Sequence, residues 1–487
     1  MNYYNIINEF QNCSILVIGD LMLDKFVIGN SSRLAPEAPI AVVDVQSTKV
    51  ALGGAANAAL NFRSLGARVS FFSICGDDQE ADLAERLLAN EEIETTLLRN
   101  TAFKTNLKTR VVSDGQVLVR YDVGSKVQLE TKLEWQFINF LEQNFCKYDM
   151  LIISDYNKGL FSENIISKLE QLKQQYCVFI AIDSKNLTAF RNINPAVVKP
   201  NYSEVINALQ IRPENDNRIE QLKNLGSELF GKFNSKIITV TLDKDGAMYF
   251  VEDKFECRGF AYPVDFQQVS GAGDAYFSAM TLSLFVGASI EETAEISSAM
   301  AAVAISKKAT AFCSKDELVA YFAKNQKMIY DRVQLKSLVE LYRLQGKTIV
   351  FTNGCFDILN SGHVSFLRKA RELGDILILA VNDDESIARI KGESRPINTL
   401  EQRIDVLSGL SSIDHIFTFG ELDDSPLEFI HIIKPQIYVK GGNYDKSDLE
   451  ESPLVVQNGG DIVIIPLIPN VSTANTIGKI MKINEID

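Results

Sequence analysis

Residues 271–274 combine two glycines and an aspartate in an order that could support phosphoryl transfer. Gly271 and Gly273 allow the backbone to approach a ligand closely, and the apolar run after them predicts a helix. The N–H groups at the start of that helix, including that of Ala272, would bind an anion, with Asp274 beside them as a base. On these four residues alone, a glycine turn whose aspartate stabilises the helix dipole is an equal alternative.

The composition excludes several classes of protein. The chain has 487 residues, 46% hydrophobic and 23% charged, which is typical of a globular protein with more than one domain. Its formal net charge of −14 argues against non-specific nucleic-acid binding, and no apolar run is long enough to span a membrane. The seven cysteines have no paired spacing, and no signal peptide is visible. We therefore expect a cytoplasmic protein that binds neither nucleic acid nor membranes.

Short apolar runs alternate with helical patterns through the first two thirds of the chain, and each run ends in polar residues. This pattern predicts a doubly wound α/β sheet with its site along the strand tips. Residues 108–121 alternate around Asp114-Gly115, which predicts a hairpin and hence a small β flap. Lys108 and Arg110 share one face of it, where they could meet a sugar phosphate, whereas Arg120 is more simply a solvated side chain.

Five residues near the start of the chain could bind a polyol. Asp20 and Asp24 follow the first predicted strand, at the edge where α/β sheets place their ligands. Gly53 and Gly54 permit close backbone approach, and Asn57 offers both a donor and an acceptor. Each residue taken alone is explained as well by an ordinary turn.

Asn201 and Glu204 lie three residues apart at a predicted helix start and can face one way. Glu204 could hold a hydrated Mg²⁺ ion near a nucleotide phosphate. The alternative is a plain helix start that is capped by Asn201 or Ser203.

These motifs, in this order, resemble those of the ribokinase-like sugar kinases over about residues 10–320. The resemblance implies that Asp274 deprotonates a sugar hydroxyl and that residues 271–273 form the anion hole. Gln268 stands where such kinases have an aspartate that helps to hold a monovalent cation, so the sequence leaves open whether the kinase domain binds one. Ala309 stands where they often have a glycine near the adenine. The residues implied to lie beside ATP and Mg²⁺ are Asn201, Tyr202, Ser203 and Glu204.

The sequence predicts a kinase domain over residues 1–325, a helical connector over 326–345 and a second domain over 346–487. In the second domain, an apolar strand is followed by a glycine turn and a polar cluster at a helix start, a typical nucleotide-phosphate site. His363 lies in that cluster, although a lone histidine is more often a cap or a surface residue. The other candidate nucleotide-binding residues are Asn353, Gly354, Phe356, Asp357, Asn360, Gly362, Lys391, Arg395, Lys440, Ser472 and Thr473.

Residues 348–482 resemble the cytidylyltransferase-like nucleotidyltransferases, whose HxGH signature binds a nucleoside triphosphate. The resemblance implies that His363 is the second histidine of the signature. Asn360 stands in place of the first, and an amide can donate a hydrogen bond but cannot carry charge.

The whole chain resembles the bifunctional D-glycero-β-D-manno-heptose-7-phosphate kinases / heptose-1-phosphate adenylyltransferases of lipopolysaccharide-core synthesis. Residues 32–39, 154–156, 391–396 and 439–442 carry the match. The resemblance implies ATP as substrate, Mg²⁺ as cofactor and an intervening phosphatase, and we expect a homodimer. Two alternatives stay open. One is a kinase fused to an impaired or regulatory nucleotidyltransferase-like domain, and the other is the same fold pair acting on another sugar phosphate or on CTP.

Overall fold

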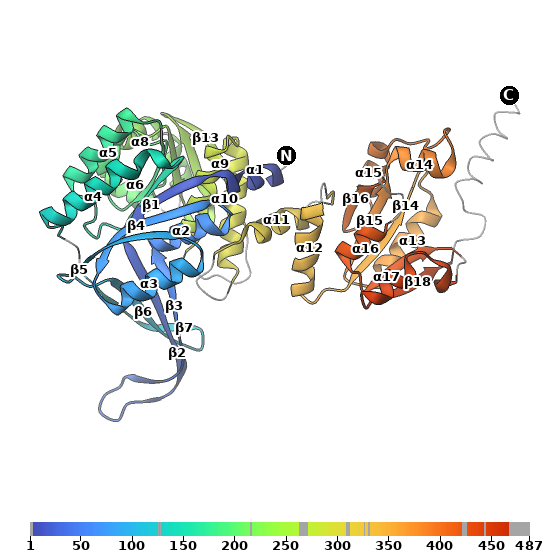
Figure 1. Ribbon diagram of the computed structural model, residues 1–487, viewed down its shortest axis with the longest axis horizontal. Coiled ribbons are helices and arrows are strands. Elements are labelled where there is room, and N and C mark those ends of the chain that lie inside the picture. Colours follow the sequence, from blue (N-terminus) through green and yellow to red (C-terminus); the bar gives the residue numbers. More distant parts are fainter. Residues whose placement is uncertain are drawn as a thin grey trace, which may run out of the picture. The chain divides into compact units, whose positions relative to one another are not determined.

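The computed structural model describes residues 3–124, 126, 128–214, 217–262, 271–307, 312–325, 327–329, 332–420, 426–442 and 445–466. The chain divides into two compact units, Met1–Leu318 and Val319–Asp487. Each unit is built on a largely parallel β-sheet with helices packed against it (Figure 1). This architecture confirms the predicted α/β fold class. None of the helices within the described ranges is long and apolar enough to cross a membrane.

The first unit contains thirteen strands and ten α-helices within its described residues, and an eleventh helix, α11, crosses the boundary between the two units. The strands are β1 (Ser14–Gly19), β2 (Leu21–Leu34), β3 (Ala41–Gly54), β4 (Arg68–Gly76), β5 (Glu94–Asn100), β6 (Asn106–Ser113), β7 (Gln116–Val123), β8 (Met150–Asp155), β9 (Phe179–Ser184), β10 (Val197–Val198), β11 (Ile237–Thr241), β12 (Ala247–Val251) and β13 (Lys254–Gly259). The helices are α1 (Tyr3–Glu9), α2 (Ala55–Ser64), α3 (Gln79–Asn90), α4 (Thr131–Asn144), α5 (Glu163–Gln175), α6 (Tyr202–Leu209), α7 (Arg218–Lys223), α8 (Gly226–Phe233), α9 (Ala272–Phe285), α10 (Ile290–Ile305) and α11 (Lys315–Asn325).

The large sheet of the first unit has the strand order β13-β12-β11-β10-β9-β8-β1-β4-β5. Neighbours from β11 to β5 pair in parallel, whereas β12 and β13 run antiparallel. The central strands β1 and β8 are buried almost throughout, which explains their continuous apolar sequences. Because parallel strands end at one edge, the polar residues that follow β1, β8, β9 and β10 are brought together there.

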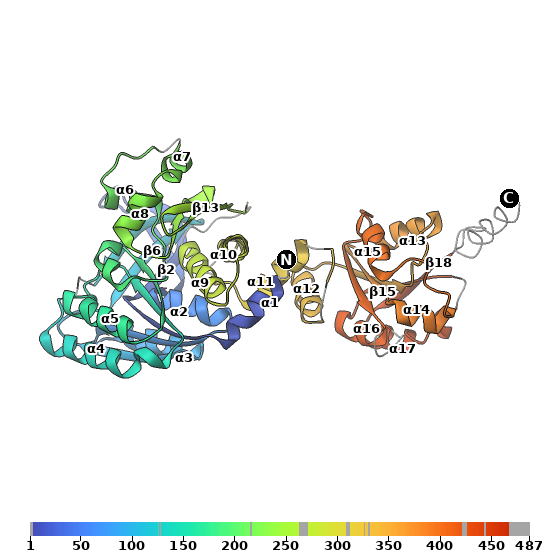
Figure 2. The ribbon, with the colours of Figure 1, turned by 90° about the horizontal axis from the view of Figure 1, so that it is seen from above.

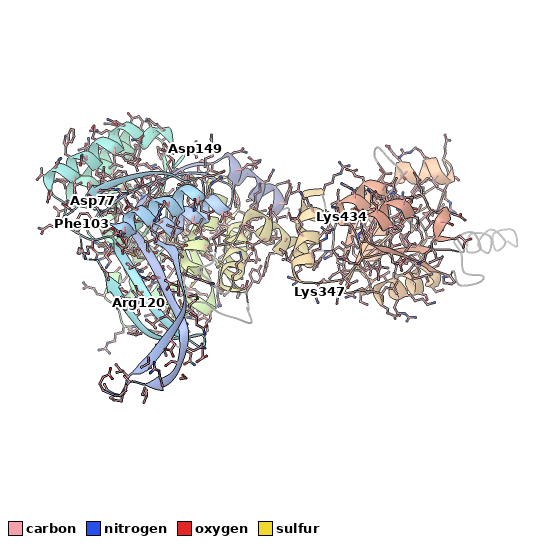
Figure 3. The ribbon with its side chains drawn as sticks, turned by 60° about the horizontal axis from the view of Figure 1, so that its bottom comes forward. Asp77, Phe103, Arg120, Asp149, Lys347 and Lys434 are labelled. Atoms are coloured by element: carbon pink, nitrogen blue, oxygen red, sulfur yellow. The ribbon has the colours of Figure 1, made fainter. Side chains whose placement is uncertain are left out.

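A second, four-stranded sheet with the order β3-β2-β6-β7 forms a flap. The predicted hairpin is confirmed: β6 and β7 pair antiparallel, and Asp114 and Gly115 have φ values of 49° and 78°, the positive values that a two-residue turn of type I′ requires. The long hairpin of β2 and β3 was not predicted. Its outer half is exposed, so its sequence lacks the regular alternation of a strand with one buried face. It extends beyond Arg120 of β7 in Figure 3.

The second unit has a five-stranded parallel sheet with the order β16-β15-β14-β17-β18 and helices on both faces (Figure 2). Helix α12 lies in the stretch predicted as a connector, and its buried Leu335, Leu338 and Tyr342 belong to one of the two hydrophobic clusters of this unit. The elements are α12 (Arg332–Leu344), β14 (Ile349–Gly354), α13 (Ser361–Arg371), β15 (Ile376–Asn382), α14 (Asp384–Lys391), α15 (Leu400–Ser408), β16 (His415–Phe419), α16 (Leu427–Ile433), β17 (Ile437–Gly441), α17 (Ser452–Gln457) and β18 (Asp461–Ile465).

Candidate active sites

Asp274 lies in the first turn of α9, directly after the glycine stretch. Gly271 is the N-cap residue with a φ of 97°, a conformation that favours glycine. The Asp274 carboxylate accepts hydrogen bonds at both oxygens, from Asn57 Nδ2 at 2.6 Å and from the Tyr156 hydroxyl at 3.2 Å. Burial raises the pKa of Asp274 to about 6, and these two hydrogen bonds and the charge of Lys199 limit the rise. The structure therefore holds a carboxylate that titrates close to neutral pH.

A cavity of about 510 Å³ lies beside the start of α9. Ala272 and Gly273 line it, and the first N–H groups of a helix have no acceptor within the helix. A cavity of this size accommodates a nucleoside with its phosphates at one end. The helix start that the sequence analysis predicted as an anion site therefore lines a cavity of this size. Other lining residues are Thr241, Lys244, Gly246, Tyr276, Ser298 and Ala302.

Lys199 is a buried cation at this site that the sequence analysis missed. Its Nζ atom pairs with Asp183 at 2.9 Å, and a side chain added at Gly273 would lie 3.9 Å from the same atom. Burial opposes the charge of Lys199, yet Asp183, Glu204 and Asp274 raise its pKa above the ordinary value. The ammonium group is therefore charged beside the glycine stretch. Lys199 could have been identified from its place in the sequence, since it lies at the end of a predicted strand, two residues before Asn201.

The flap brings its basic residues to the strand tips. Arg110 of β6 pairs with Asp24 of β2 at 2.5 Å, and both side chains are largely buried. Gly53 lies against the same carboxylate, since a Cβ atom there would come within 2.6 Å of Asp24 Oδ2. Lys108 lies over the Tyr156 ring, with Nζ 5.3 Å from the ring centre. Four residues predicted from separate motifs thus lie close together: Asp24, Gly53, Lys108 and Arg110. The Arg110 guanidinium is already paired with the Asp24 carboxylate.

Asp20 is buried, and its carboxylate binds backbone N–H groups. Its Oδ2 atom accepts hydrogen bonds from the N–H groups of Tyr156 at 2.7 Å and Lys158 at 3.3 Å. Its backbone carbonyl accepts a hydrogen bond from the N–H group of Ala55, the first residue of helix α2. The residue before it, Gly54, is the N-cap of α2 and has a φ of 56°. Burial and the nearby Asp155 raise the pKa of Asp20 to about 7. Asp20 therefore fixes the loop after β8.

Asn201 and Glu204 form a capping box at the start of α6. Asn201 Oδ1 accepts from Glu204 N at 2.9 Å, and Glu204 Oε2 accepts from Asn201 N at 2.8 Å. The other carboxylate oxygen of Glu204 pairs with Lys185 at 2.5 Å. The Tyr202 side chain is buried and donates to Gln221, so only its backbone is available to a ligand, whereas Ser203 is exposed. The helix-capping role that the sequence analysis gave as an alternative is therefore present at Asn201.

In the second unit, Asn360 caps helix α13. Its Oδ1 atom accepts from the N–H groups of Gly362 at 3.0 Å and His363 at 3.2 Å. Its buried Nδ2 atom has no hydrogen-bond partner among the described residues. His363 Nδ1 accepts from Asn360 N at 3.3 Å, and its ring lies 5.4 Å from that of Phe356. Burial and the charge of Lys391 lower the pKa of His363, so the imidazole is neutral at physiological pH.

Lys440 belongs to a network at the end of β17. Its Nζ atom donates to Asn353 Oδ1 at 2.9 Å and to Glu451 Oε1 at 2.8 Å. The Tyr438 hydroxyl oxygen lies 2.8 Å and 2.9 Å from the same two oxygens, and its single proton can be donated to either of them. The sequence analysis missed Glu451 and Tyr438, which fix Lys440 beside Asn353.

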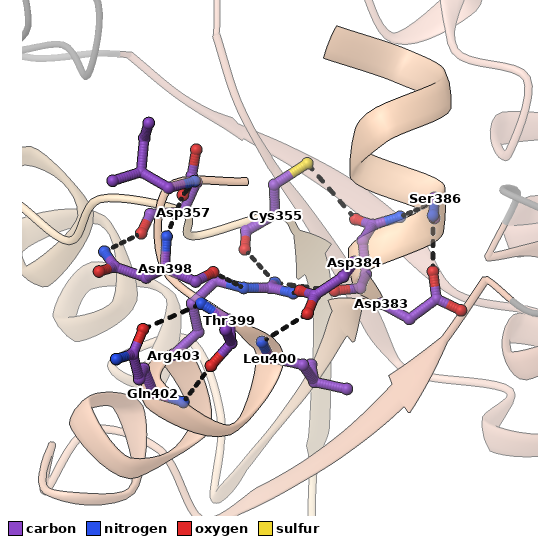
Figure 4. Close-up of polar contacts among 12 residues, drawn as sticks. Cys355, Asp357, Asp383, Asp384, Ser386, Asn398, Thr399, Leu400, Gln402 and Arg403 are labelled. Atoms are coloured by element: carbon purple, nitrogen blue, oxygen red, sulfur yellow. Dashed lines mark hydrogen bonds and ion pairs between the residues drawn. The ribbon is translucent and has the colours of Figure 1, made fainter. Parts of the chain in front are cut away.

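A third network ties the loop before α15 to the end of β14 (Figure 4). The Asp357 carboxylate pairs with Arg395 and accepts from the N–H groups of Ile397 at 2.7 Å and Asn398 at 3.1 Å. Arg403 is fully buried and donates to the carbonyls of Cys355 and Asn382, each at 2.7 Å, and to the Asp384 carboxylate. Arg395 is thus paired with Asp357. Arg403, which the sequence analysis missed, braces the ends of β14 and β15 and the start of α14 against one another.

Arg403→Met should destabilise the second unit by about 3–5 kcal/mol, because several carbonyls and the Asp384 carboxylate lose a buried charged donor. Thermal unfolding followed by calorimetry measures the loss. Arg332→Met is the matched control, since Arg332 pairs with Glu428 on the surface and should change stability by less than about 1 kcal/mol. Equal effects of the two substitutions would contradict the bracing role of Arg403.

Four residues named from the sequence lie outside the described residues: Gln268, Ala309, Ser472 and Thr473.

Both units match known protein families. The model of the pfkB family carbohydrate kinases matches residues 13–317, and the cytidylyltransferase-like model matches residues 351–473. The bifunctional protein HldE of Syntrophotalea carbinolica is 33% identical over 99% of this chain and 98% of its own length. That of Pasteurella multocida is 34% identical over 98% of this chain and 99% of its own. The chain belongs to the HldE family.

Membership of the HldE family confirms the predicted bifunctional enzyme, in which a carbohydrate kinase is joined to a nucleotidyltransferase. The first unit also shares its fold with phosphofructokinase-2 from Escherichia coli, solved in complex with substrates and products. That structure aligns with a TM-score of 0.52 and 22% identity over 63% of this chain and 97% of that chain. The kinase site described above therefore lies in a carbohydrate-kinase fold.

Proposed function

We propose that the first unit transfers the γ-phosphoryl group of ATP to the anomeric hydroxyl of D-glycero-β-D-manno-heptose 7-phosphate. The observation that carries the proposal is the Asp274 carboxylate, held at both oxygens at the start of α9 and directly after two residues that line the cavity. Asp274 accepts the hydroxyl proton, and the N–H groups at the helix start stabilise the charge on the transferred group. Lys199 supplies a fixed positive charge beside them.

The second unit transfers AMP from ATP to heptose 1-phosphate and releases pyrophosphate. Support comes from the helix start that carries Asn360 and His363, and from Lys391, whose charge acts on His363. A second cation, Lys440, is held beside Asn353 at the ends of the paired strands β14 and β17. Donors aimed at the phosphate oxygens stabilise the charge that develops during the displacement. A separate phosphatase removes the 7-phosphate between the two steps.

At the kinase site, Mg²⁺ would accompany the ATP substrate. No group of three or more His, Cys, Asp or Glu side chains that could hold a metal occurs in the described part of the chain, and Mg²⁺ is typically held by one or two carboxylates plus substrate phosphates. Glu204 is the carboxylate that would hold the ion, in place of its present partner, the half-exposed Lys185. Bound Mg²⁺ would offset the charge of the phosphates.

The kinase rate should fall as the pH drops through about 6. Asp274 acts as a base only when ionised, and burial raises its pKa to about 6. Protonation at lower pH therefore removes the active form, and kcat declines tenfold for each further pH unit. ADP formation measured with heptose 7-phosphate between pH 5 and pH 8 tests this. A flat profile down to pH 5 would contradict the assignment of Asp274 as the base.

The flap forms a homodimer interface. Strand β7 is an edge strand, and five of its large apolar side chains are 40% or more exposed: Val117, Leu118, Val119, Tyr121 and Val123. An exposed apolar edge strand invites pairing with another chain, and a second copy is the partner of matching chemistry.

Val119→Arg should therefore halve the mass found by light scattering, because a charge on β7 would be buried between the two copies. Val456→Arg is the matched control, since Val456 is also an exposed valine, on α17 of the other unit, and should leave the mass unchanged. A wild-type monomer, or a Val119→Arg dimer, would disprove this interface.

We place the enzyme in the cytoplasm, where its seven free thiols would stay reduced.

A further inference from the structure

Tyr156 stands at the end of β8, where buried carboxylates hold its backbone. Its N–H group donates to Asp20 Oδ2 at 2.7 Å, and the next N–H group, that of Asn157, donates to Asp155 Oδ1 at 2.8 Å. Asp155 is itself held by the Ser184 hydroxyl at 2.6 Å. The location of the Tyr156 ring is therefore set by the sheet edge and does not depend on a bound ligand.

The Tyr156 side chain joins three elements of the kinase site. Its hydroxyl donates to Asp274 Oδ1 at 3.2 Å, and the face of its ring lies under Lys108 of the flap strand β6. The second oxygen of Asp274 accepts from Asn57 Nδ2 at the shorter distance of 2.6 Å. The two oxygens of the carboxylate are thus held unequally, one closely by α2 and the other more loosely by the loop after β8.

We propose that Tyr156 is a positioning residue that orients Asp274 and leaves Oδ1 as the oxygen that receives the substrate proton. The inference rests on the proposed role of Asp274 as the base. Each carboxylate oxygen has two lone-pair sites, so Oδ1 can keep the Tyr156 hydrogen bond and still accept a proton from the sugar hydroxyl. Asn57 keeps Oδ2 in place during the same step.

The bond changes of this step balance without a further reactant. The anomeric O–H bond breaks, and its proton moves to Asp274 Oδ1. The freed electron pair forms the bond from oxygen to the γ-phosphorus, while the bond between that phosphorus and the bridging oxygen of ATP breaks and ADP leaves with its electrons. Tyr156 retains its proton throughout, because its pKa lies well above the ordinary value owing to burial and to the charge of Asp274.

The groups that face Asp274 come from four elements. Asp183 at the end of β9 disfavours its ionised form, whereas Lys199 after β10, Asn57 on α2 and Tyr156 after β8 favour it. Removal of the Tyr156 hydroxyl takes away one of the three groups that stabilise the carboxylate and leaves the other two, Lys199 and Asn57, in place. The ionised base then becomes harder to form.

The test is the pH dependence of kcat for the kinase reaction of the full chain carrying Tyr156→Phe. The acidic limb should move to higher pH by about 0.5–1 unit, because a hydrogen bond to the charged form is lost. The Michaelis constant for the sugar should change little, because phenylalanine keeps the ring under Lys108. Tyr148→Phe is the matched control: Tyr148 lies before the other end of β8 and should leave the limb unmoved.

Incorporation of 3-fluorotyrosine at Tyr156 keeps the inference testable should Tyr156→Phe fold poorly. The fluorinated phenol is a stronger donor, so the limb should move to lower pH. A limb that coincides with the wild type in both proteins overturns the inference while Asp274 remains the base. Full kinase activity of Asp274→Asn would instead overturn the proposed function on which it rests.

Discussion

Asp274→Asn is expected to lower kcat of the kinase reaction by a factor of about 10²–10⁴, which is the usual contribution of a positioned general base. Asparagine is close to isosteric, so Asn57 and Tyr156 can still contact it. What it lacks is an ionised oxygen that can accept the hydroxyl proton. Binding of ATP should change little, because the N–H groups at the start of α9 and the adjoining cavity are untouched.

The second unit supplies an internal control for this substitution. Pyrophosphate release with heptose 1-phosphate takes place in a separate compact unit and should keep the wild-type rate. Loss of both activities would indicate misfolding and would say nothing about the base. A kinase that keeps more than about a tenth of its rate would contradict the account, because such a residue contributes too little to be the general base.

Substitutions at the start of α13 are expected to have the second largest effects. Asn360→Asp should lower the adenylyltransferase rate by about 10²–10³, the typical cost of removing one donor from a site that stabilises a transition state. Aspartate can still cap α13 through a carboxylate oxygen, so the fold should be kept. The buried Nδ2–H donor, however, is replaced by a negative charge that repels phosphate.

Two further variants complete this series. His363→Ala should cause a loss of similar size, because it removes the neighbouring imidazole of the same helix start. Asn360→His should change the rate by less than about tenfold if the amide donor already serves the reaction. A gain of about a hundredfold or more would mean that the asparagine impairs the wild-type enzyme and would favour the regulatory alternative. Rates are measured as pyrophosphate release, with kinase activity as the control for folding.

Local patterns made part of the fold and of the kinase site predictable. The glycine stretch before Asp274, the turn at Asp114-Gly115 and the apolar runs of the central strands each depend on residues close together in the chain. Such features are set by backbone conformation and by burial on both faces of a sheet, so their signals survive without tertiary information.

The partners of these residues could not be predicted, because they are distant in sequence. Tyr156 and Asp274 are 118 residues apart, and Arg403 and the Cys355 carbonyl are 48 residues apart. The role of Lys199 can be recognised only in the folded chain, where its ammonium group lies beside Gly273 of α9 and Asp183 of β9. The fold alone brings these polar groups into contact.

The most direct test of the central claim is pyrophosphate release by the full chain supplied with heptose 1-phosphate, ATP and Mg²⁺. The account predicts steady release that Asp274→Asn leaves unchanged and His363→Ala reduces by about 10²–10³. No release from the wild-type chain, in a preparation that phosphorylates heptose 7-phosphate, would contradict a working second site and leave the chain a kinase with a non-catalytic nucleotidyltransferase fold.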